Sequence, residues 1–360
     1  MRAKEKTDFL VSALLGWFSK NARQLPWRKT SDPYAIWISE IMLQQTQVKT
    51  VIPYWGRWLR ELPTIDSLAN ASSEKIHKLW EGLGYYTRVR NLQKTAVIIC
   101  EKHAGKFPET FEDVFALPGI GRYTAGAICS IAFNQTTAIL DGNVIRVLTR
   151  VFGIRENPHE KKTNVMLWKL AKNLVLNSKF KTQKSKLSCS HLNQSLMELG
   201  ALICTPRQPK CLLCPLQKKC VARLENLVEK IPNLGERIKP TARRFVAFLV
   251  ERRGKFFVRQ RRSGIVNAHL WEFPNIEVFS DKMDFTNLPG PFFLLPKFST
   301  KPVCQIKHSI TRYRISLEVF RARFKKNSRS KIESGEWRTL EELDQFAFTS
   351  AHRKILRRLC

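Results

Sequence analysis

Long apolar segments are missing from the 360-residue sequence, in which no uninterrupted apolar stretch reaches the length of a membrane span. The run at residues 9–15 follows three basic residues, yet no small-residue cleavage site comes after it, so it does not fit a secretory leader. Leu10, Leu14, Trp17 and Phe18 recur at helical spacing instead, which predicts a packed amphipathic helix. Internal repeats and low-complexity tracts are also lacking, which excludes a repeat architecture.

Acidic residues are scarce relative to basic ones. The chain has 30 Asp and Glu against 62 Lys and Arg, a formal net charge of +32. Such an excess favours polyanionic partners through phosphate neutralisation and counterion release. The basic residues are spread along the whole chain, which does not suit a membrane-surface helix. We therefore expect nucleic acid as the partner.

Cysteine usage does not suit a disulfide framework. The nine cysteines are an odd number, and four of them fall in one short segment, which indicates a reducing compartment. We expect a cytoplasmic protein, associated with the nucleoid if the source is bacterial. The four form the pattern Cys204-x6-Cys211-x2-Cys214-x5-Cys220. Thiolates at this spacing can ligate zinc or an iron–sulfur cluster, and a single Cys-x2-Cys favours a [4Fe–4S] cluster over the paired knuckles of a zinc ribbon.

The length and the changing pattern of the chain predict two domains. Residues 1–226 read as short helices punctuated by Pro and Gly, ending with the cysteine loop at 204–220. Residues 227–241 resemble a linker. From residue 242 to 360 the period changes, with strand-like segments at 245–250, 255–258 and 313–319 and a helix from Ser350. The predicted fold is an all-α domain followed by an α+β domain.

Two glycines, Gly119 and Gly121, form a tight turn before a predicted helix. Such a turn can direct backbone N–H groups toward a phosphate, although a plain helix connection gives the same pattern. On a chain of this charge, the segment of about residues 111–133 is a candidate hairpin for gripping a DNA backbone.

Two carboxylates have unusual surroundings. Glu40 lies in an apolar helix that begins at Asp32-Pro33, so burial would raise its pKa and let it act as a general acid. Asp141 opens a helix after an apolar strip, where the helix dipole would keep a carboxylate ionised. One protonated and one charged carboxyl group suit the cleavage of a glycosidic bond. Taken singly, Asp141 could be an N-cap and Glu40 a residue at the rim of the core.

Further segments suit contacts with bases. The amide-rich stretch at residues 43–47 can hydrogen-bond base edges or fill the space left by an extruded base, or it can be a solvated helix end. Residues 84–90 interleave aromatics with arginines, which suits stacking and phosphate neutralisation. Alternatively, the adjacent Tyr85 and Tyr86 of that segment cover the edge of a hydrophobic core.

Taken together, these motifs closely resemble the MutY adenine DNA glycosylases of the helix-hairpin-helix superfamily. The likeness runs in order from about Leu25 to Cys220 and continues more weakly at residues 270–274. It implies a two-lobed helical domain with DNA bound between the lobes, a structural [4Fe–4S] cluster, and a Nudix-like second domain that reads 8-oxoguanine. The implied partner is double-stranded DNA containing A opposite 8-oxoguanine or G, and the implied state is a monomer.

The resemblance also implies roles for residues of this chain. The enzymes of the family flip adenine out of the duplex and hydrolyse its N-glycosidic bond. Glu40 would protonate N7 of the base, Asp141 would stabilise the sugar, and Asn143 and Tyr123 would support them. Trp27, Arg28 and Gln194 match positions lining the adenine pocket. The positions matched to DNA contacts are Leu43, Gln45, Tyr85, Arg88, Gly119 and Gly121.

Endonuclease III-like pyrimidine glycosylases are the alternative, since they share the cysteine spacing. They cut the backbone through a Schiff-base lysine, and that lysine would stand at Tyr123. A tyrosine forms no imine, so we expect a monofunctional enzyme that leaves an abasic site. One departure concerns the loop that contacts 8-oxoguanine, where the family has Phe-Ser-His. This chain has Ile306 followed by Lys307, His308 and Ser309, so either Lys307 contacts phosphate instead or Ser309 takes the place of the serine through a shifted loop.

Overall fold

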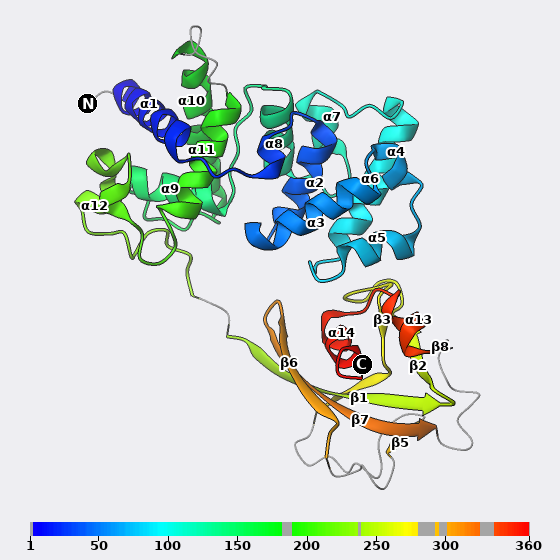
Figure 1. The fold of residues 1–360 in the computed structure, drawn as a ribbon. Coiled ribbons are helices and arrows are strands. Elements are labelled where there is room, and N and C mark those ends of the chain that lie inside the picture. The colour runs from blue at the N-terminus through cyan, green and yellow to red at the C-terminus, as the bar shows by residue number, and fades with distance from the viewer. Residues whose placement is uncertain are drawn as a thin grey trace. The chain divides into compact units, whose positions relative to one another are not determined.

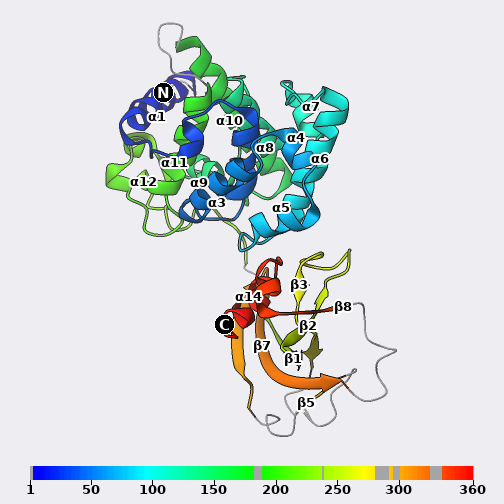
Figure 2. The same cartoon turned by 45° about the vertical axis from the view of Figure 1, so that its right-hand side comes forward.

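The computed structural model describes residues 3–181, 189–236, 239–279, 292–294, 301–324 and 335–359. The chain divides into two compact units (Figures 1 and 2). The first contains Met1–Asn70 and Asn91–Arg237, and the second contains Ala71–Arg90 and Ile238–Cys360. Within the described ranges, no helix has both the length and the apolar character that a membrane span needs.

The first unit is helical, as the sequence predicted. In chain order its helices are α1 (Ala3–Asn21), η1 (Pro26–Arg28), α2 (Pro33–Leu43), α3 (Val48–Glu61), α4 (Ile65–Ala69), α6 (Thr87–His103), α7 (Phe111–Ala116), α8 (Arg122–Ala132), α9 (Gly142–Phe152), α10 (Lys161–Lys181), α11 (Cys189–Leu202), η2 (Cys211–Leu213), η3 (Gln217–Lys219) and α12 (Val221–Leu224). Helix α6 begins in the second unit and continues into the first.

One core of the first unit joins α1 to α9, α10 and α11. Leu10 and Leu14 on α1 are each 1% exposed and pack with apolar residues of the other three helices, which confirms the helix predicted from their spacing. The buried Ile231 also belongs to this core, so the chain still packs on the helical unit inside the segment expected to be a linker. The linker boundaries themselves stay a prediction.

Helix α2 is surrounded by other side chains. Every residue from Tyr34 to Met42 is buried, because apolar side chains occupy almost the whole circumference of the helix. Asp32 caps its start by accepting hydrogen bonds from the backbone N–H groups of Tyr34 and Ala35, both at 3.1 Å, and Pro33 occupies the first turn. The predicted start of this helix is confirmed. Glu40 is therefore held inside a rigid apolar segment.

The second unit is built around a mixed sheet, which confirms the predicted α+β class. Strand β1 (Thr241–Arg252) pairs in parallel with β7 (Tyr313–Phe324), and β6 (Cys304–Ile310) and β5 (Phe292–Leu294) pair with the other side of β7. The remaining described elements are β2 (Lys255–Gln260), β3 (Trp271–Glu272), β4 (Asn275–Val278), β8 (Gly335–Arg338), α5 (Ser73–Trp80), α13 (Leu340–Asp344) and α14 (Ser350–Leu356). The predicted helix from Ser350 is confirmed.

The loop expected at Lys307, His308 and Ser309 is a strand. These residues lie in β6 and pair in antiparallel register with Ser316, Ile315 and Arg314 of β7. The physical reason is the alternation of the segment, in which Ile306 is buried and Lys307 and Ser309 are exposed. Successive side chains therefore point to opposite faces, and Lys307 lies on the face opposite to His308.

Two glycines in the middle of helices provide a test of the packing. A Cβ atom at Gly126 of α8 would lie 2.4 Å from the carbonyl oxygen of Ala138, whereas one at Gly56 of α3 would meet nothing within 4 Å. We expect Gly126→Ala to lower the free energy of unfolding of the helical unit by about 1–3 kcal/mol. The control Gly56→Ala should raise it by about 0.5–1 kcal/mol, because alanine favours the helix. Urea unfolding followed by circular dichroism measures both changes. Equal changes in the two variants would contradict the close approach of α8 to the carbonyl oxygen of Ala138.

Candidate active site and cysteine cavity

A tight turn positions the first residues of α8. Gly119 has φ +74°, and a Cβ atom there would lie 2.6 Å from the side-chain amide of Asn91, so glycine suits both the backbone and the space. Gly121 is the N-cap of α8. The predicted turn before a helix is confirmed, and its role in gripping DNA stays a prediction. The turn places Tyr123 in the first turn of α8.

Glu40 and Tyr123 meet in the interior of the helical unit. The Tyr123 hydroxyl donates a hydrogen bond of 2.8 Å to Oε2 of Glu40, which is 5% exposed. Burial raises the pKa of Glu40 to about 7. The hydrogen bond from Tyr123 opposes the rise, the negative charge of Asp141 adds to it and the guanidinium of Arg28 opposes it. A carboxyl group with this pKa can deliver a proton near neutrality, as the sequence predicted.

Asp141 is the N-cap of α9. Its Oδ1 accepts a hydrogen bond of 2.7 Å from the Val144 N–H, and its Oδ2 accepts one of 2.9 Å from the side-chain amide of Asn143. Burial raises the pKa of Asp141, while these two hydrogen bonds and the Arg146 guanidinium lower it. The predicted N-cap is confirmed. The expectation that the helix N-terminus alone sets its ionisation is incomplete, because burial acts in the opposite direction.

Arg146 links the Asp141 site to the cysteine segment. Its Nη2 donates to Oδ1 of Asn143 at 2.8 Å, and its Nε donates to the carbonyl oxygen of Cys204 at 2.6 Å. A Cβ atom at Gly200 would lie 2.6 Å from Cβ of Asn143, so α11 approaches α9 closely at this point. The sequence reasoning did not single out Arg146. Its spacing of three residues from Asn143 on one helix was the available signal.

One of the expected base-pocket residues, Arg28, binds a buried carboxylate that the sequence reasoning missed. Trp27 is 7% exposed and packs edge-to-face on Trp55. Arg28 donates to both carboxylate oxygens of Glu198, which is 1% exposed, and Arg23 binds the same group. Burial alone would raise the pKa of Glu198, but the hydrogen bonds from both arginines outweigh it and lower the pKa to about 2.

Gln194 lies on α11 with Glu198, one turn earlier in the helix. Its side-chain amide donates a hydrogen bond of 2.9 Å to the Ser190 hydroxyl. Glu198 is embedded in the apolar sequence Leu196-Met197-Glu198-Leu199, which was the available signal for a buried, paired carboxylate.

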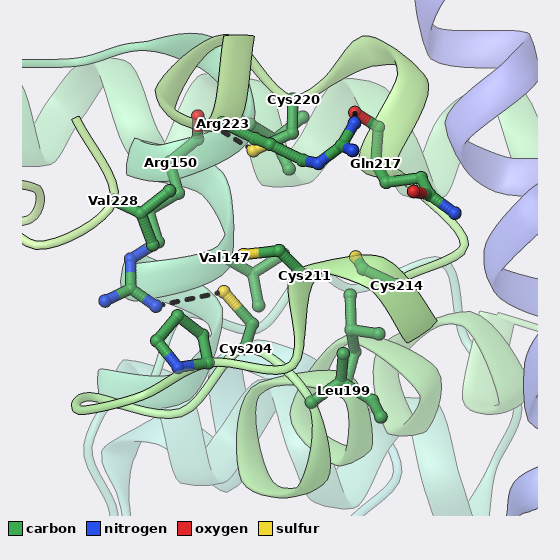
Figure 3. Close-up of a pocket in the computed structure, with 13 residues that line it drawn as sticks. Val147, Arg150, Leu199, Cys204, Cys211, Cys214, Gln217, Cys220, Arg223 and Val228 are labelled. Carbon is green, nitrogen blue, oxygen red and sulfur yellow. Dashed lines mark hydrogen bonds between the residues drawn. The ribbon is translucent and has the colours of Figure 1, made fainter. Parts of the chain in front are cut away.

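The four cysteines line one cavity of the helical unit (Figure 3). Cys204, Cys211 and Cys214 are partly buried, and Cys220 is 9% exposed. Across the described part of the chain, no group of three or more His, Cys, Asp or Glu side chains is arranged to hold a single metal ion.

A buried arginine faces the cysteine cavity. Arg150 is 2% exposed, and its Nη1 lies 3.4 Å from the sulfur of Cys204 in Figure 3. The guanidinium also donates to the carbonyl oxygens of Thr205, Pro206 and Ile231. Burial raises the pKa of Cys211, and Arg150 and Arg223 oppose the rise. A fixed positive charge beside four thiols offsets the negative charge that they acquire on binding a metal.

The residues expected to contact DNA are distributed over both units. In the first unit Leu43 ends α2, and the exposed Gln45 has a positive φ of 56°. In the second unit Tyr85 is 49% exposed and has a φ of 48°. Side chains at these strained, accessible positions suit insertion between the bases of DNA. The insertion itself stays a prediction.

Arg88 differs from its expected placement as a phosphate contact. Its Nη2 donates hydrogen bonds of 3.0 Å to the carbonyl oxygens of Leu83 and Gly84, and its guanidinium stacks over the rings of Trp80 and Tyr85. Burial lowers the pKa of Arg88 to about 10. The side chain thus fixes the turn that presents Tyr85, because the turn leaves two carbonyl groups that need donors.

A pocket of about 560 Å³ lies in the second unit. Tyr85 and Gly84 contribute to one part of its wall, and His308 and Ser309 contribute to another, whereas Lys307 is absent from the lining. Nδ1 of His308 is buried without a hydrogen-bond partner among the described residues. Burial lowers the pKa of His308, and the nearby Lys354 adds to this effect, so the ring is neutral near pH 7. A neutral imidazole with an unused nitrogen can donate to or accept from a ligand.

Comparison with known families gives two matches along the chain. Residues 38–173 match the family described as HhH-GPD superfamily base excision DNA repair protein, and residues 245–358 match the NUDIX domain. An adenine DNA glycosylase of Rattus norvegicus is 34% identical over 96% of this chain and 76% of its own length. That of Buchnera aphidicola subsp. Acyrthosiphon pisum is 38% identical over 75% of each chain.

Solved structures resemble the helical part of the chain. A thermostable thymine-DNA glycosylase superposes with a TM-score of 0.56 at 29% identity, over 62% of this chain and all of that one. An endonuclease III in a non-covalent DNA complex superposes with a TM-score of 0.51 at 20% identity, over 63% and 99%. The second likeness establishes the fold alone.

The raised pKa of Glu40 predicts a pH-dependent stability. Below about pH 4.5 Glu40 is protonated in the folded and unfolded chain, and as the pH rises through 7 the folded state is penalised by up to about 3 kcal/mol. We expect Glu40→Gln to stabilise the helical unit at pH 8 by several degrees in melting temperature and much less at pH 5. Thermal unfolding at both values measures this.

Glu198→Gln is the matched contrast, because the pKa of Glu198 is lowered and its ionised form is the stabilising one. This variant should be less stable than the parent at pH 5 and at pH 8. If the Glu40→Gln protein is no more stable than the parent at pH 8, this result would contradict the conclusion that burial raises the pKa of Glu40.

Proposed function

The chain belongs to the adenine DNA glycosylase family, and from this premise we propose that it removes adenine mispaired with 8-oxoguanine or guanine in duplex DNA, leaving an abasic site. The enzyme is a monofunctional glycosylase that hydrolyses the N-glycosidic bond. The observation that carries the proposal is the pair of carboxyl groups in one buried site, Glu40 and Asp141, each held by its own hydrogen bonds.

Glu40 supplies the proton. With a pKa of about 7, a large fraction of the group is protonated at neutral pH, and Tyr123 occupies only its Oε2. The other oxygen is then available to N7 of an extruded adenine. Protonation makes the base a neutral leaving group, which lowers the barrier to cleavage of the bond to the sugar.

Asp141 stabilises the sugar that is left. The Asn143 amide and the Val144 N–H fix both carboxylate oxygens, so the group needs no reorganisation as positive charge develops on the sugar. The negative charge of Asp141 also raises the pKa of Glu40. The charge of Asp141 therefore favours the protonated state that Glu40 requires.

Tyr123 excludes the mechanism of the endonuclease III-like alternative. A lyase needs an amine at this position to form a Schiff base, and a phenol forms none. Burial raises the pKa of Tyr123 well above its usual value, so the hydroxyl keeps its proton and continues to donate to Glu40. The product is then an abasic site with an intact backbone.

DNA binding is supported by the charge and by the surface turns. The net charge of +32 favours phosphate binding, and Gly121, at the end of the Gly119–Gly121 turn, is exposed with nothing within 4 Å of an added Cβ atom. The family positions that line the base pocket are matched by Trp27, Arg28 and Gln194. The family positions whose side chains insert into the duplex are matched by Leu43, Gln45 and Tyr85. We expect the DNA to be bound by a monomer.

The second unit is the candidate reader of 8-oxoguanine. It belongs to the Nudix-like class, and its pocket of about 560 Å³ exceeds the size of a single base. His308 offers a buried nitrogen without a partner among the described residues. Ser309 also lines the pocket, although the alternation along β6 places its side chain on the face opposite to His308, and Lys307 does not line the pocket.

The cysteine cavity fits a structural [4Fe–4S] cluster. Four thiols line it, a buried arginine lies against the sulfur of Cys204, and the single Cys-x2-Cys spacing favours a cluster over the paired knuckles of a zinc ribbon. Cys204, Cys211, Cys214 and Cys220 would be the ligands. The cluster would supply cross-links that hold a segment with little other secondary structure, and it has no part in the hydrolysis.

The reaction is tested with two duplexes, one with A opposite 8-oxoguanine and one with thymine glycol opposite A. We expect strand cleavage of the first only after alkali, a slower reaction when guanine replaces 8-oxoguanine, and none on the second. Glu40→Gln should bind the first duplex but release adenine at least ~10²-fold more slowly. Glu74→Gln, on the exposed start of α5, is the matched control and should react like the parent. Cleavage of the thymine glycol duplex without alkali would support the alternative instead.

The metal is tested on the purified protein. We expect iron and sulfide in equal amounts and an absorbance band near ~400 nm, which zinc does not give. Cys214→Ser should lose the band and lower the melting temperature of the helical unit. Cys100→Ser, which changes a partly buried cysteine outside the cavity, should keep both. Stoichiometric zinc without iron would contradict the assignment.

A further inference from the structure

We propose that Glu81 is a positioning residue for recognition of the base opposite adenine, because its carboxylate joins two walls of the pocket in the second unit. The inference rests on the proposed function, in which this pocket reads 8-oxoguanine. Glu81 is not part of the pocket lining and acts through the segments that are. It is carried by hydrogen bonds between residues 267 and 272 positions apart in the chain.

Two separate stretches of the chain supply these walls. The first wall is residues 83–87, which form the turn after α5 and the start of α6 and include Tyr85. The second wall is residues 349–352, at the start of α14. A ligand that contacts both walls binds tightly only if the walls keep a fixed distance, because their rearrangement would cost binding energy.

Glu81 follows α5 directly and precedes the first wall by two residues. Its Oε1 accepts a hydrogen bond of 2.8 Å from the backbone N–H of Phe348 and one of 2.7 Å from Nε of Arg353. These two donors stand immediately before and immediately after the second wall. Its Oε2 accepts a bond of 3.1 Å from Nζ of Lys78, so both oxygens are engaged. One carboxylate therefore holds both ends of residues 349–352.

The ion pair between Glu81 and Arg353 is shielded from water. The exposed fractions of the two side chains are 14% and 10%. The guanidinium of Arg353 also lies over the ring of Phe348, 5.3 Å from the centroid. A charge-assisted hydrogen bond in such surroundings is stronger than one on the surface, where water and salt weaken it. The connection between the two walls is therefore stiff.

The turn between Glu81 and Tyr85 has little freedom of its own. The indole Nε1 of the buried Trp80 donates a hydrogen bond of 3.1 Å to the carbonyl oxygen of Gly84, and Nη2 of Arg88 donates one of 3.0 Å to the same oxygen. Because the turn is braced at this point, a displacement of Glu81 at its base displaces the exposed Tyr85 at its tip.

Other bonds should keep the second unit folded when the charge of Glu81 is removed. Arg353 also donates to Oδ1 of Asp344 at 2.9 Å and to the carbonyl oxygen of Phe346. Lys78 donates to the carbonyl oxygens of Asp344 and Phe346. A glutamine at position 81 keeps one oxygen as an acceptor but loses the ionic attraction to Arg353. The walls then separate more easily within a folded unit.

The test compares the binding of the full chain to two duplexes, one with A opposite 8-oxoguanine and one with A opposite guanine. Dissociation constants are measured in the Glu40→Gln background, which should bind without releasing adenine. For Glu81→Gln we expect the constant for the first duplex to rise about 10-fold and that for the second less than about 3-fold. The control Glu74→Gln, the same change on the exposed start of α5, should alter neither.

Adenine release separates positioning from a general loss of activity. With Glu40 in place and the protein in saturating excess, Glu81→Gln should release adenine from either duplex at the single-turnover rate of the parent. The reason is that Glu40 and Asp141 lie in the first unit, whereas Glu81 lies in the second.

A double-mutant cycle with Tyr85→Ala tests the route of the effect. In the Tyr85→Ala protein, Glu81→Gln should reduce the preference for 8-oxoguanine little further, because the side chain that Glu81 positions is already gone. Lys78→Gln gives an independent measurement if Glu81→Gln does not fold. The Lys78 side chain is 35% exposed and bonds to Glu81, so its loss should lower the preference in the same direction.

Circular dichroism establishes that each variant is folded. An unchanged preference in folded Glu81→Gln, or in Lys78→Gln if the first variant does not fold, would overturn the inference. Equal weakening of both duplexes, or additive effects of Glu81→Gln and Tyr85→Ala, would do the same. A parent protein that does not prefer 8-oxoguanine to guanine would instead overturn the proposed reader.

Discussion

The burial of Glu40 within α2 is the constraint on which the remaining chemistry depends. A carboxyl group in water is ionised at neutral pH and holds no proton to give, whereas one surrounded by apolar side chains keeps it. The helix achieves this because nearly all its positions are occupied by buried residues from Tyr34 to Met42. Tyr123 then fixes one oxygen without removing the proton from the other.

This constraint conflicts with the overall charge of the molecule. A chain with a net charge of +32 is suited to DNA, but positive charges near Glu40 favour its ionised form. The structure meets both demands by pairing the arginines close to the acid with carboxylates or carbonyl oxygens. Arg28 is bound to Glu198, and Arg146 is bound to Asn143 and to three backbone carbonyl groups.

Helices α9 and α11 connect the acid site to the cysteine cavity. Asp141 and Arg150 lie at the start and near the end of α9, and Glu198 and Gly200 lie on α11 before the chain enters the cysteine segment. The close approach of Gly200 to Asn143 and the bonds of Arg146 to both sides make these regions one packed structure. Disruption of the cysteine segment would therefore displace the residues that hold Asp141.

The sequence alone determined the local features of this protein. Residue spacing and capping patterns are short-range, so the α1 and α2 helices, the turn at Gly119, the N-cap Asp141 and the strands β1, β2 and β7 could be predicted. The buried position of Glu40 could be inferred because all its neighbours in the chain are apolar. The pairing of Glu40 with Asp141 was a hypothesis from their surroundings, which the family likeness supported.

Only the tertiary structure decided which distant groups meet. Glu198 pairs with Arg23 and Arg28 across more than 160 positions of the chain, and Arg150 faces Cys204 across 54. No periodicity encodes such contacts, because they depend on how whole helices pack. For the same reason Arg88 proved to bind the backbone of a turn, and Lys307 proved to lie in a strand on the face opposite to His308. Hydrogen-bond partners and strand register are properties of the folded chain.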